Sequence, residues 1–141
     1  MIKAALVATL MTPPSPSGEE LAALPDSVDW LEVRADVVGD INPEWLRRHF
    51  KGRLLYSLRS RAAGGDSLDS LPERHQRLET AALHYDRVEL EADRDFTPGL
   101  LRKIPAEQRL ASWHGPARDY VSQGYTRRSG VSIRSYCDGR S

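Results

Sequence analysis

The chain of 141 residues is long enough for one domain with a single hydrophobic core, and 40% of its residues are apolar and 28% charged. Its 20 basic and 20 acidic side chains balance, which excludes a nucleic-acid-binding polyelectrolyte and favours a small molecule or another protein as the partner. The single cysteine, Cys137, excludes an intrachain disulfide framework and a cysteine-built metal site, and a cytoplasmic location is expected.

The chain begins with an apolar run at 2–10, which predicts a buried strand because it is far too short to span a membrane. A loop rich in proline and serine follows at 12–18. A short helix is then predicted at 19–24, with Glu19 and Glu20 in its first turn, where the helix dipole favours acidic side chains.

The same order of strand, loop and helix then repeats along the chain. Asn42 and Pro43 open the second helix as its cap and first residue. The further strands are predicted at 29–33, 53–58, 87–90 and 109–113, and the later helices at 71–84 and 97–104. Five strands that alternate with four helices predict an α/β fold with a parallel sheet and right-handed crossovers.

Eight such units form a (β/α)₈ TIM-type barrel of roughly 250 residues. We therefore predict an incomplete barrel of about five strands and four helices over residues 1–116. An open doubly wound sheet is the alternative, but its glycine-rich phosphate turn is missing, since the first loop contains only Gly18.

Residues 117–141 break the pattern. Seventeen leucines lie in residues 1–110 and none in 111–141, while 117–141 contains five arginines, five serines and three glycines. We interpret this segment as an atypical tail. Disorder, a short extra hairpin and a change of reading frame remain open.

Unusual polar residues end four of the predicted strands, where the chemistry of parallel α/β proteins gathers. Strand 29–33 contains Glu32, and Arg34 and Asp36 follow it. The three side chains alternate onto one face. An arginine there can hold a carboxylate with two hydrogen bonds, and an imidazole titrates near neutral pH. The remaining candidates are Arg59 before the diglycine 64–65, the carboxylates Glu89 and Glu91, and His114. A structural ion-pair network is the alternative interpretation of Glu32, Arg34 and Asp36.

Five short segments carry a family resemblance: 7–10 (Val-Ala-Thr-Leu), 29–36 (Asp-Trp-Leu-Glu-Val-Arg-Ala-Asp), 57–60 (Ser-Leu-Arg-Ser) with Gly64-Gly65, 88–91 (Val-Glu-Leu-Glu) and 112–114 (Ser-Trp-His). Together they resemble type I 3-dehydroquinate dehydratase over about residues 2–116. The resemblance implies a barrel lyase of the shikimate pathway of aromatic amino acid biosynthesis, which converts 3-dehydroquinate to 3-dehydroshikimate through a lysine Schiff base. It implies no metal and no external cofactor.

The resemblance also implies roles for five residues. His114 corresponds to the general acid and base. Glu32, Arg34 and Arg59 correspond to residues that line the substrate site, and Thr9 to a hydroxyl on the substrate side of the first strand.

Three features depart from the family pattern. The family's imine-forming lysine lies on the sixth strand, and none of Lys3, Lys51 and Lys103 matches it, so we expect a truncated chain that is inactive alone. Ala63 stands just before the diglycine, where the family usually has a glutamate that pairs with the histidine. Glu89 stands at a position where an aspartate is common in the family.

Two other interpretations remain open. The chain could be a half-barrel that completes its sheet with another chain, for example as a homodimer, because edge strands invite pairing. It could also be a non-catalytic α/β domain that binds a small carboxylate.

Overall fold

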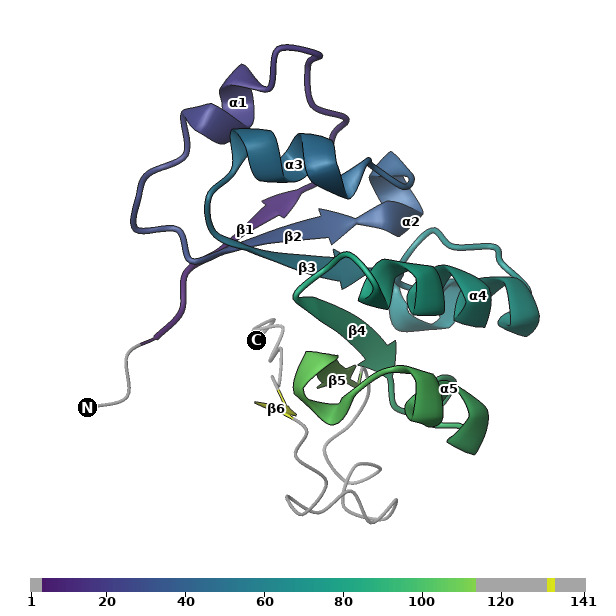
Figure 1. The fold of residues 1–141 in the computed structure, drawn as a ribbon. Helices are drawn as coiled ribbons and strands as arrows, with labels where there is room; N and C mark the ends of the chain where they lie inside the picture. Colours follow the sequence, from purple (N-terminus) through teal and green to yellow (C-terminus); the bar gives the residue numbers. More distant parts are fainter. Residues whose placement is uncertain (1–3, 114–131, 134–141) are drawn as a thin grey trace, which may run out of the picture.

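The computed structural model describes residues 4–113 and 132–133, which form a single parallel sheet with helices (Figure 1). The strands lie side by side in the order of the sequence, and each neighbouring pair is parallel. Their bounds are β1 Val7–Leu10, β2 Trp30–Arg34, β3 Arg53–Ser57, β4 Arg87–Glu91, β5 Arg109–Ser112 and β6 Ser132–Ile133. The predicted parallel α/β class is confirmed.

The helices follow the strands along the chain. They are α1 Glu19–Ala22, α2 Ala35–Val38, α3 Pro43–His49, α4 Leu71–Ala82 and α5 Pro98–Lys103, with 3₁₀ turns η1 Arg61–Ala63 and η2 Ala106–Gln108. The five strands and four helices that the sequence predicts are all present, with ends that differ by a few residues. The short helix α2 and the two-residue β6 are additional.

One local prediction is wrong. The alternation of Glu32, Arg34 and Asp36 predicted a single extended strand, but β2 ends at Arg34 and Asp36 belongs to α2. The backbone leaves the strand conformation at Arg34, with φ −82° and ψ 80°, and there its guanidinium binds the carboxylate of Asp36 two residues later.

Helices α3, α4 and α5 begin where side chains satisfy free backbone N–H groups of the first turn. The Asn42 side chain accepts hydrogen bonds from the N–H groups of Glu44 and Trp45 at the start of α3. Ser70 and Glu73 form a capping box at the start of α4. Both helices also carry proline within their first two positions.

The sheet separates two apolar clusters. Leu31, Val33 and other outward residues of the strands pack against Leu46 of α3 and Leu78 of α4 in the main core. Figure 1 shows α1, α3, α4 and α5 along this outer side of the sheet. The opposite, inner face carries a smaller cluster of Trp30, Leu55, Leu110 and Val7.

This strand order identifies the architecture. In a doubly wound sheet the chain reverses direction and the strand order departs from the sequence, whereas in a barrel each strand follows its predecessor. The observed order β1-β2-β3-β4-β5-β6 is that of a barrel arc. Within the described residues the sheet is open, because β1 pairs only with β2, and β6 only with β5.

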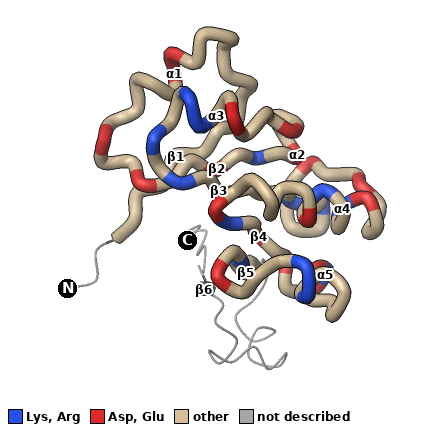
Figure 2. The backbone as a smooth tube through the Cα atoms, viewed as in Figure 1, with Lys and Arg blue, Asp and Glu red and all other residues tan. Residues whose placement is uncertain are grey.

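Acidic and basic residues are interspersed along the backbone, as Figure 2 shows. No helix in the described part of the chain is both long and apolar enough to cross a bilayer.

Candidate functional site

A chain of hydrogen bonds joins polar side chains on the inner face of the sheet, above the Trp30 cluster. Thr9 Oγ1 donates to Glu32 Oε1 at 3.0 Å. Ser57 Oγ lies 2.9 Å from Glu32 Oε2 and 2.6 Å from Glu89 Oε2. Glu32, Ser57 and Glu89 are all buried, so three neighbouring strands bring two carboxyl groups together around one hydroxyl.

The two carboxyl groups meet because the strands are parallel and in register. Glu32 is level with Thr9 on β1 and with Leu55 on β3. Ser57 is two positions further along β3 and faces the same side. A hydroxyl has one hydrogen, so Ser57 donates to one carboxylate at a time. Carboxylate oxygens are acceptors of the kind that bind hydroxyl groups.

Arg34 lies at the end of β2 and is bound to Asp36. The guanidinium donates from Nε and Nη2 to the two carboxylate oxygens, at 2.9 and 2.7 Å. This hydrogen bond to Asp36 raises the pKa of Arg34 above its ordinary value. Burial alone would raise the pKa of Asp36, but Arg34 and the backbone N–H of Asp66 outweigh it and hold that pKa below its ordinary value.

Arg59 follows β3 at this edge. Its Nε is buried and has no hydrogen-bond partner among the described residues. The diglycine loop wraps closely around it, since a Cβ on Gly65 would lie 2.2 Å from the Arg59 carbonyl oxygen. Gly64 has a φ of 82°, which favours glycine. The diglycine thus fixes the backbone that presents Arg59.

A second charged network, formed by Arg74, Glu91 and Asp95, lies at the same edge of the sheet. The sequence analysis did not predict it. Arg74 of α4 donates to Asp95 at 2.8 and 2.6 Å, and also to the carbonyl of Leu58. Glu91 accepts from the N–H and the hydroxyl of Ser60, both at 2.8 Å. Arg74, Asp95 and Glu91 have almost no exposed side-chain surface. Their pairing joins β3, α4 and β4, so we assign this network to support and not to ligand binding.

A small cavity lies between the loop after β3 and the ends of β4 and β5. Ala63 at the end of η1 borders this cavity of about 20 Å³ beside Glu91 and Ser112. Ser112 Oγ is buried without a hydrogen-bond partner among the described residues. His114 lies outside the described residues, two positions after the end of β5, so its predicted role stays a prediction.

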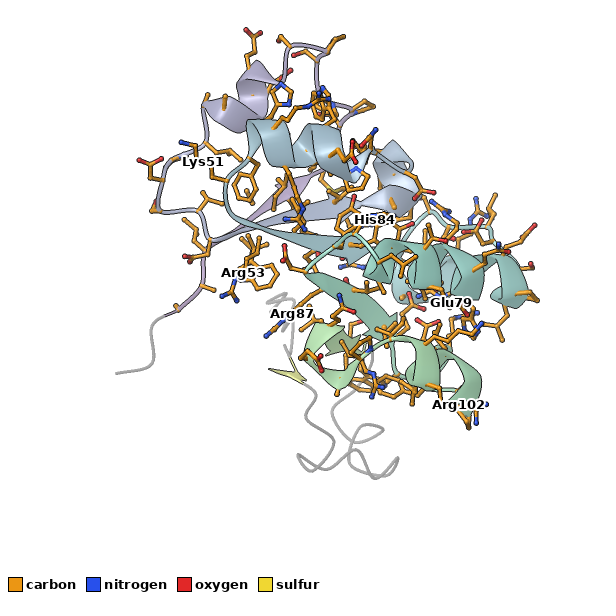
Figure 3. The ribbon with its side chains drawn as sticks, in the orientation of Figure 1. Lys51, Arg53, Glu79, His84, Arg87 and Arg102 are labelled. Atoms are coloured by element: carbon orange, nitrogen blue, oxygen red, sulfur yellow. The ribbon has the colours of Figure 1, made fainter. Side chains whose placement is uncertain are left out.

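The described lysines lie away from this edge. Lys51 precedes β3 at the amino end of the sheet, and Lys103 ends α5 and pairs with Glu79 on the outer side (Figure 3). Lys3 is outside the described residues. Among residues 4–113, no group of three His, Cys, Asp or Glu side chains is arranged to hold a metal ion.

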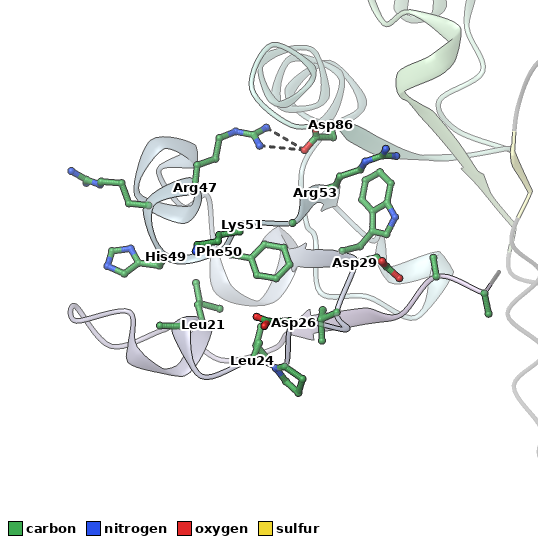
Figure 4. Close-up of a pocket in the computed structure, with 18 residues that line it drawn as sticks. Leu21, Leu24, Asp26, Asp29, Arg47, His49, Phe50, Lys51, Arg53 and Asp86 are labelled. Atoms are coloured by element: carbon green, nitrogen blue, oxygen red, sulfur yellow. Dashed lines mark hydrogen bonds and ion pairs between the residues drawn. The ribbon is translucent and has the colours of Figure 1, made fainter.

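A hollow of about 1020 Å³ lies at the opposite, amino end of the strands (Figure 4). Its lining includes Leu21 and Phe50. Two of its charged side chains have partners: Arg47 binds Asp86 at 3.3 Å, and Asp29 accepts the Leu6 N–H at 2.8 Å. Because catalytic residues of β/α barrels gather at the carboxyl ends of strands, we place the candidate site there and not in this hollow.

The predicted site residues therefore group as follows. Thr9 and Glu32 belong to one hydrogen-bonded chain with Ser57 and Glu89. Arg34 and Arg59 end the neighbouring strands β2 and β3. The role of Ser57 was not predicted, although its alternation with Leu55 on β3 is the pattern that assigns it to the inner face.

No protein-family model matches the sequence, and no curated protein is significantly similar to it. Three solved structures share the fold. A 3-dehydroquinate dehydratase from Enterococcus faecalis aligns with 77% of this chain at 15% identity and a TM-score of 0.61. A type I 3-dehydroquinate dehydratase from Clostridium difficile, solved with covalently modified comenic acid, aligns with 92% at 15% identity and a TM-score of 0.57. The enzyme from Aquifex aeolicus aligns with 91% at 17% identity and a TM-score of 0.58.

At these identities the likeness establishes the fold, which is that of TIM-type barrel dehydratases. The chain spans about half the length of the first two structures, 52% and 48%, and 65% of the third. The expectation of an incomplete barrel thus agrees with the structural neighbours.

Proposed function

We propose that this chain carries the substrate-binding part of a 3-dehydroquinate dehydratase site at the carboxyl edge of β1 to β4. The observation that carries the proposal is the convergence of Glu32, Ser57 and Glu89 from three successive strands. Its setting, a barrel arc similar in fold to 3-dehydroquinate dehydratases, supports the same assignment.

The chemistry of the substrate fits these groups. 3-Dehydroquinate is a ring that carries a carboxylate, hydroxyl groups and a ketone. Arg59 supplies a guanidinium for the carboxylate, since no described carboxylate pairs with it. Arg34 lies on the neighbouring strand end, where Asp36 holds its guanidinium in place. Glu32 and Glu89 accept hydrogen bonds from ring hydroxyl groups, and Thr9 adds a hydroxyl beside Glu32.

The covalent part of the reaction needs an amine and a proton-transfer group. His114 is proposed for proton transfer, one residue beyond Trp113. Neither Lys51 nor Lys103 is near the carboxyl edge, so the described residues do not provide the amine. We therefore assign substrate binding to this chain and expect no Schiff-base turnover from it alone. Binding of a small carboxylate without chemistry is the second candidate function, and the placement of these two lysines favours it.

Calorimetric titration with quinate, which retains the carboxylate and hydroxyl groups, tests the binding assignment. We expect saturable binding that weakens at least about tenfold in Arg59→Met, because a charged hydrogen-bond donor is lost. Arg102→Met, on the exposed outer surface of α5, is the matched control and should bind as the wild type does. Equal binding by Arg59→Met and wild type, or stronger binding of glucose 6-phosphate than of quinate, would exclude the proposed site.

A further inference from the structure

Two arginines contact the same aromatic ring at the amino end of the sheet. Trp30 begins β2, Arg53 begins β3 and Arg87 begins β4. The guanidinium carbon of Arg53 lies 5.4 Å from the centroid of the Trp30 ring, and that of Arg87 lies 5.3 Å from this centroid. Figure 3 shows both arginines at this end of the sheet. One ring therefore holds two positive charges close together.

The acidic residues that precede β2 and β4 bind other groups. Asp29 accepts the backbone N–H of Leu6 at 2.8 Å. Asp86 accepts the backbone N–H of Leu54 at 2.8 Å and pairs with an arginine of α3. Within the described part of the chain, no carboxylate forms an ion pair with either arginine on the ring. Both positive charges are therefore available to an anion.

The two arginines have surface that a ligand can reach. Arg53 is exposed and Arg87 is half-buried, whereas Trp30 is only 9% exposed. Arg53 and Ser57 lie at opposite ends of β3, and the ends of a five-residue strand are about 13 Å apart. The arginine pair is therefore distinct from the proposed substrate site at the carboxyl edge.

We propose that Arg53 and Arg87 form a binding site for a small multivalent oxyanion of the phosphate class. Each guanidinium offers a planar set of N–H donors that matches phosphate oxygens. A phosphate or diphosphate group presents several anionic oxygens and can bind both guanidiniums at once, whereas a single carboxylate neutralises one charge. The cation–π contacts with Trp30 restrain both side chains, so less side-chain freedom is lost on binding. The site is independent of the proposed dehydratase function.

Titration of the ¹⁵N-labelled full chain with pyrophosphate, followed by ¹H–¹⁵N correlation spectra, tests the proposal. We expect saturable shifts of the Trp30 indole N–H and of the backbone amides of Arg53 and Arg87. Arg53→Met and Arg87→Met should each weaken binding about tenfold, because a charged hydrogen-bond donor is lost. Arg87→Lys keeps the charge without the planar donors and should weaken binding less. Arg102→Met, on the exposed surface of α5, is the matched control and should bind as the wild type does.

Sodium chloride at the same ionic strength should not reproduce these shifts, because screening by salt needs no defined contact. Three outcomes would overturn the proposal. The first is a folded wild type without saturable shifts in pyrophosphate, or with the same shifts in sodium chloride. The second is equal binding by wild type and both methionine variants of the pair. The third is an equal loss in Arg102→Met, which would indicate attraction by net charge alone.

Discussion

The guanidinium of Arg34 donates two hydrogen bonds, of 2.9 and 2.7 Å, to the carboxylate of Asp36 at the junction of β2 and α2. The Asp36 side chain has no exposed surface, and it also accepts the backbone N–H of Asp66 in the diglycine loop. One carboxylate thus holds together the ends of β2 and the loop after β3. The candidate site depends on this junction for its shape.

Removing the charge of Asp36 should therefore lower stability in a pH-dependent manner. The pKa of Asp36 in the folded protein is below its ordinary value, so this stabilisation is complete above the unfolded pKa of about 3.9 and is lost as pH falls through the folded pKa. We expect Asp36→Asn to reduce the free energy of unfolding by about 1–2 kcal/mol at pH 7 and by much less near pH 3. Urea titrations at both pH values measure this; a difference independent of pH would contradict it.

Arg74→Met should be the most destabilising substitution at the carboxyl edge. It removes the buried guanidinium that Asp95 and Glu91 share, although Arg94 remains 3.6 Å from Glu91, and loss of one partner of a buried pair typically costs about 3–5 kcal/mol. Lys103→Met removes an exposed pair with Glu79 and should change the free energy of unfolding by about 0.5 kcal/mol or less. Urea unfolding of both variants gives the comparison. Similar small losses for the two would show that the Arg74 network is not structural.

Much of the fold follows from local sequence, because its determinants are neighbours in the chain. The apolar run Leu54–Leu55–Tyr56 and the cap of Asn42 and Pro43 predict β3 and the start of α3 correctly. The pairing of Arg74 with Asp95 could not be predicted, since the partners are 21 residues apart and a helical pattern treats arginine as one more polar residue.

The candidate site was predicted in part for the same reason. Alternation along the second strand assigned Glu32 to its polar face, and the resemblance implied the role of Thr9. The structure joins these two side chains by a hydrogen bond. The same alternation misplaced Asp36, because a strand pattern does not reveal that a side chain folds back on its neighbour. Whether an outward-facing residue such as Tyr85 lines a cavity depends on how α3 and α4 pack on the outer face of the sheet. The sequence pattern does not show this packing.

Ser57→Ala should weaken the inner hydrogen-bond chain. It removes the hydroxyl between Glu32 and Glu89 and leaves buried oxygens without this donor, so we expect a loss of about 1–3 kcal/mol. Ser112→Ala is a matched control on β5, because its hydroxyl has no hydrogen-bond partner among the described residues and its removal should be nearly neutral. Thermal unfolding of the two variants separates these cases. Equal melting temperatures would argue against a bridging role for Ser57.

Covalent trapping tests the assignment of the amine. After incubation of the purified chain with 3-dehydroquinate and borohydride, we expect an unchanged intact mass, because Lys51 and Lys103 lie away from the carboxyl edge. A stable adduct would mean that a lysine outside the described residues, or one from a second chain, reaches the substrate. Peptide mapping would then identify that lysine.

The central claim, that the carboxyl edge of β1 to β4 binds a quinate-like carboxylate, is tested most directly by titrating the ¹⁵N-labelled chain with quinate. We predict saturable amide shifts that cluster at Thr9, Glu32, Arg59 and Gly65 and are lost in Arg59→Met. Shifts that cluster instead around Phe50 and Lys51 at the amino-end hollow, or no shifts in a folded sample, would contradict this assignment.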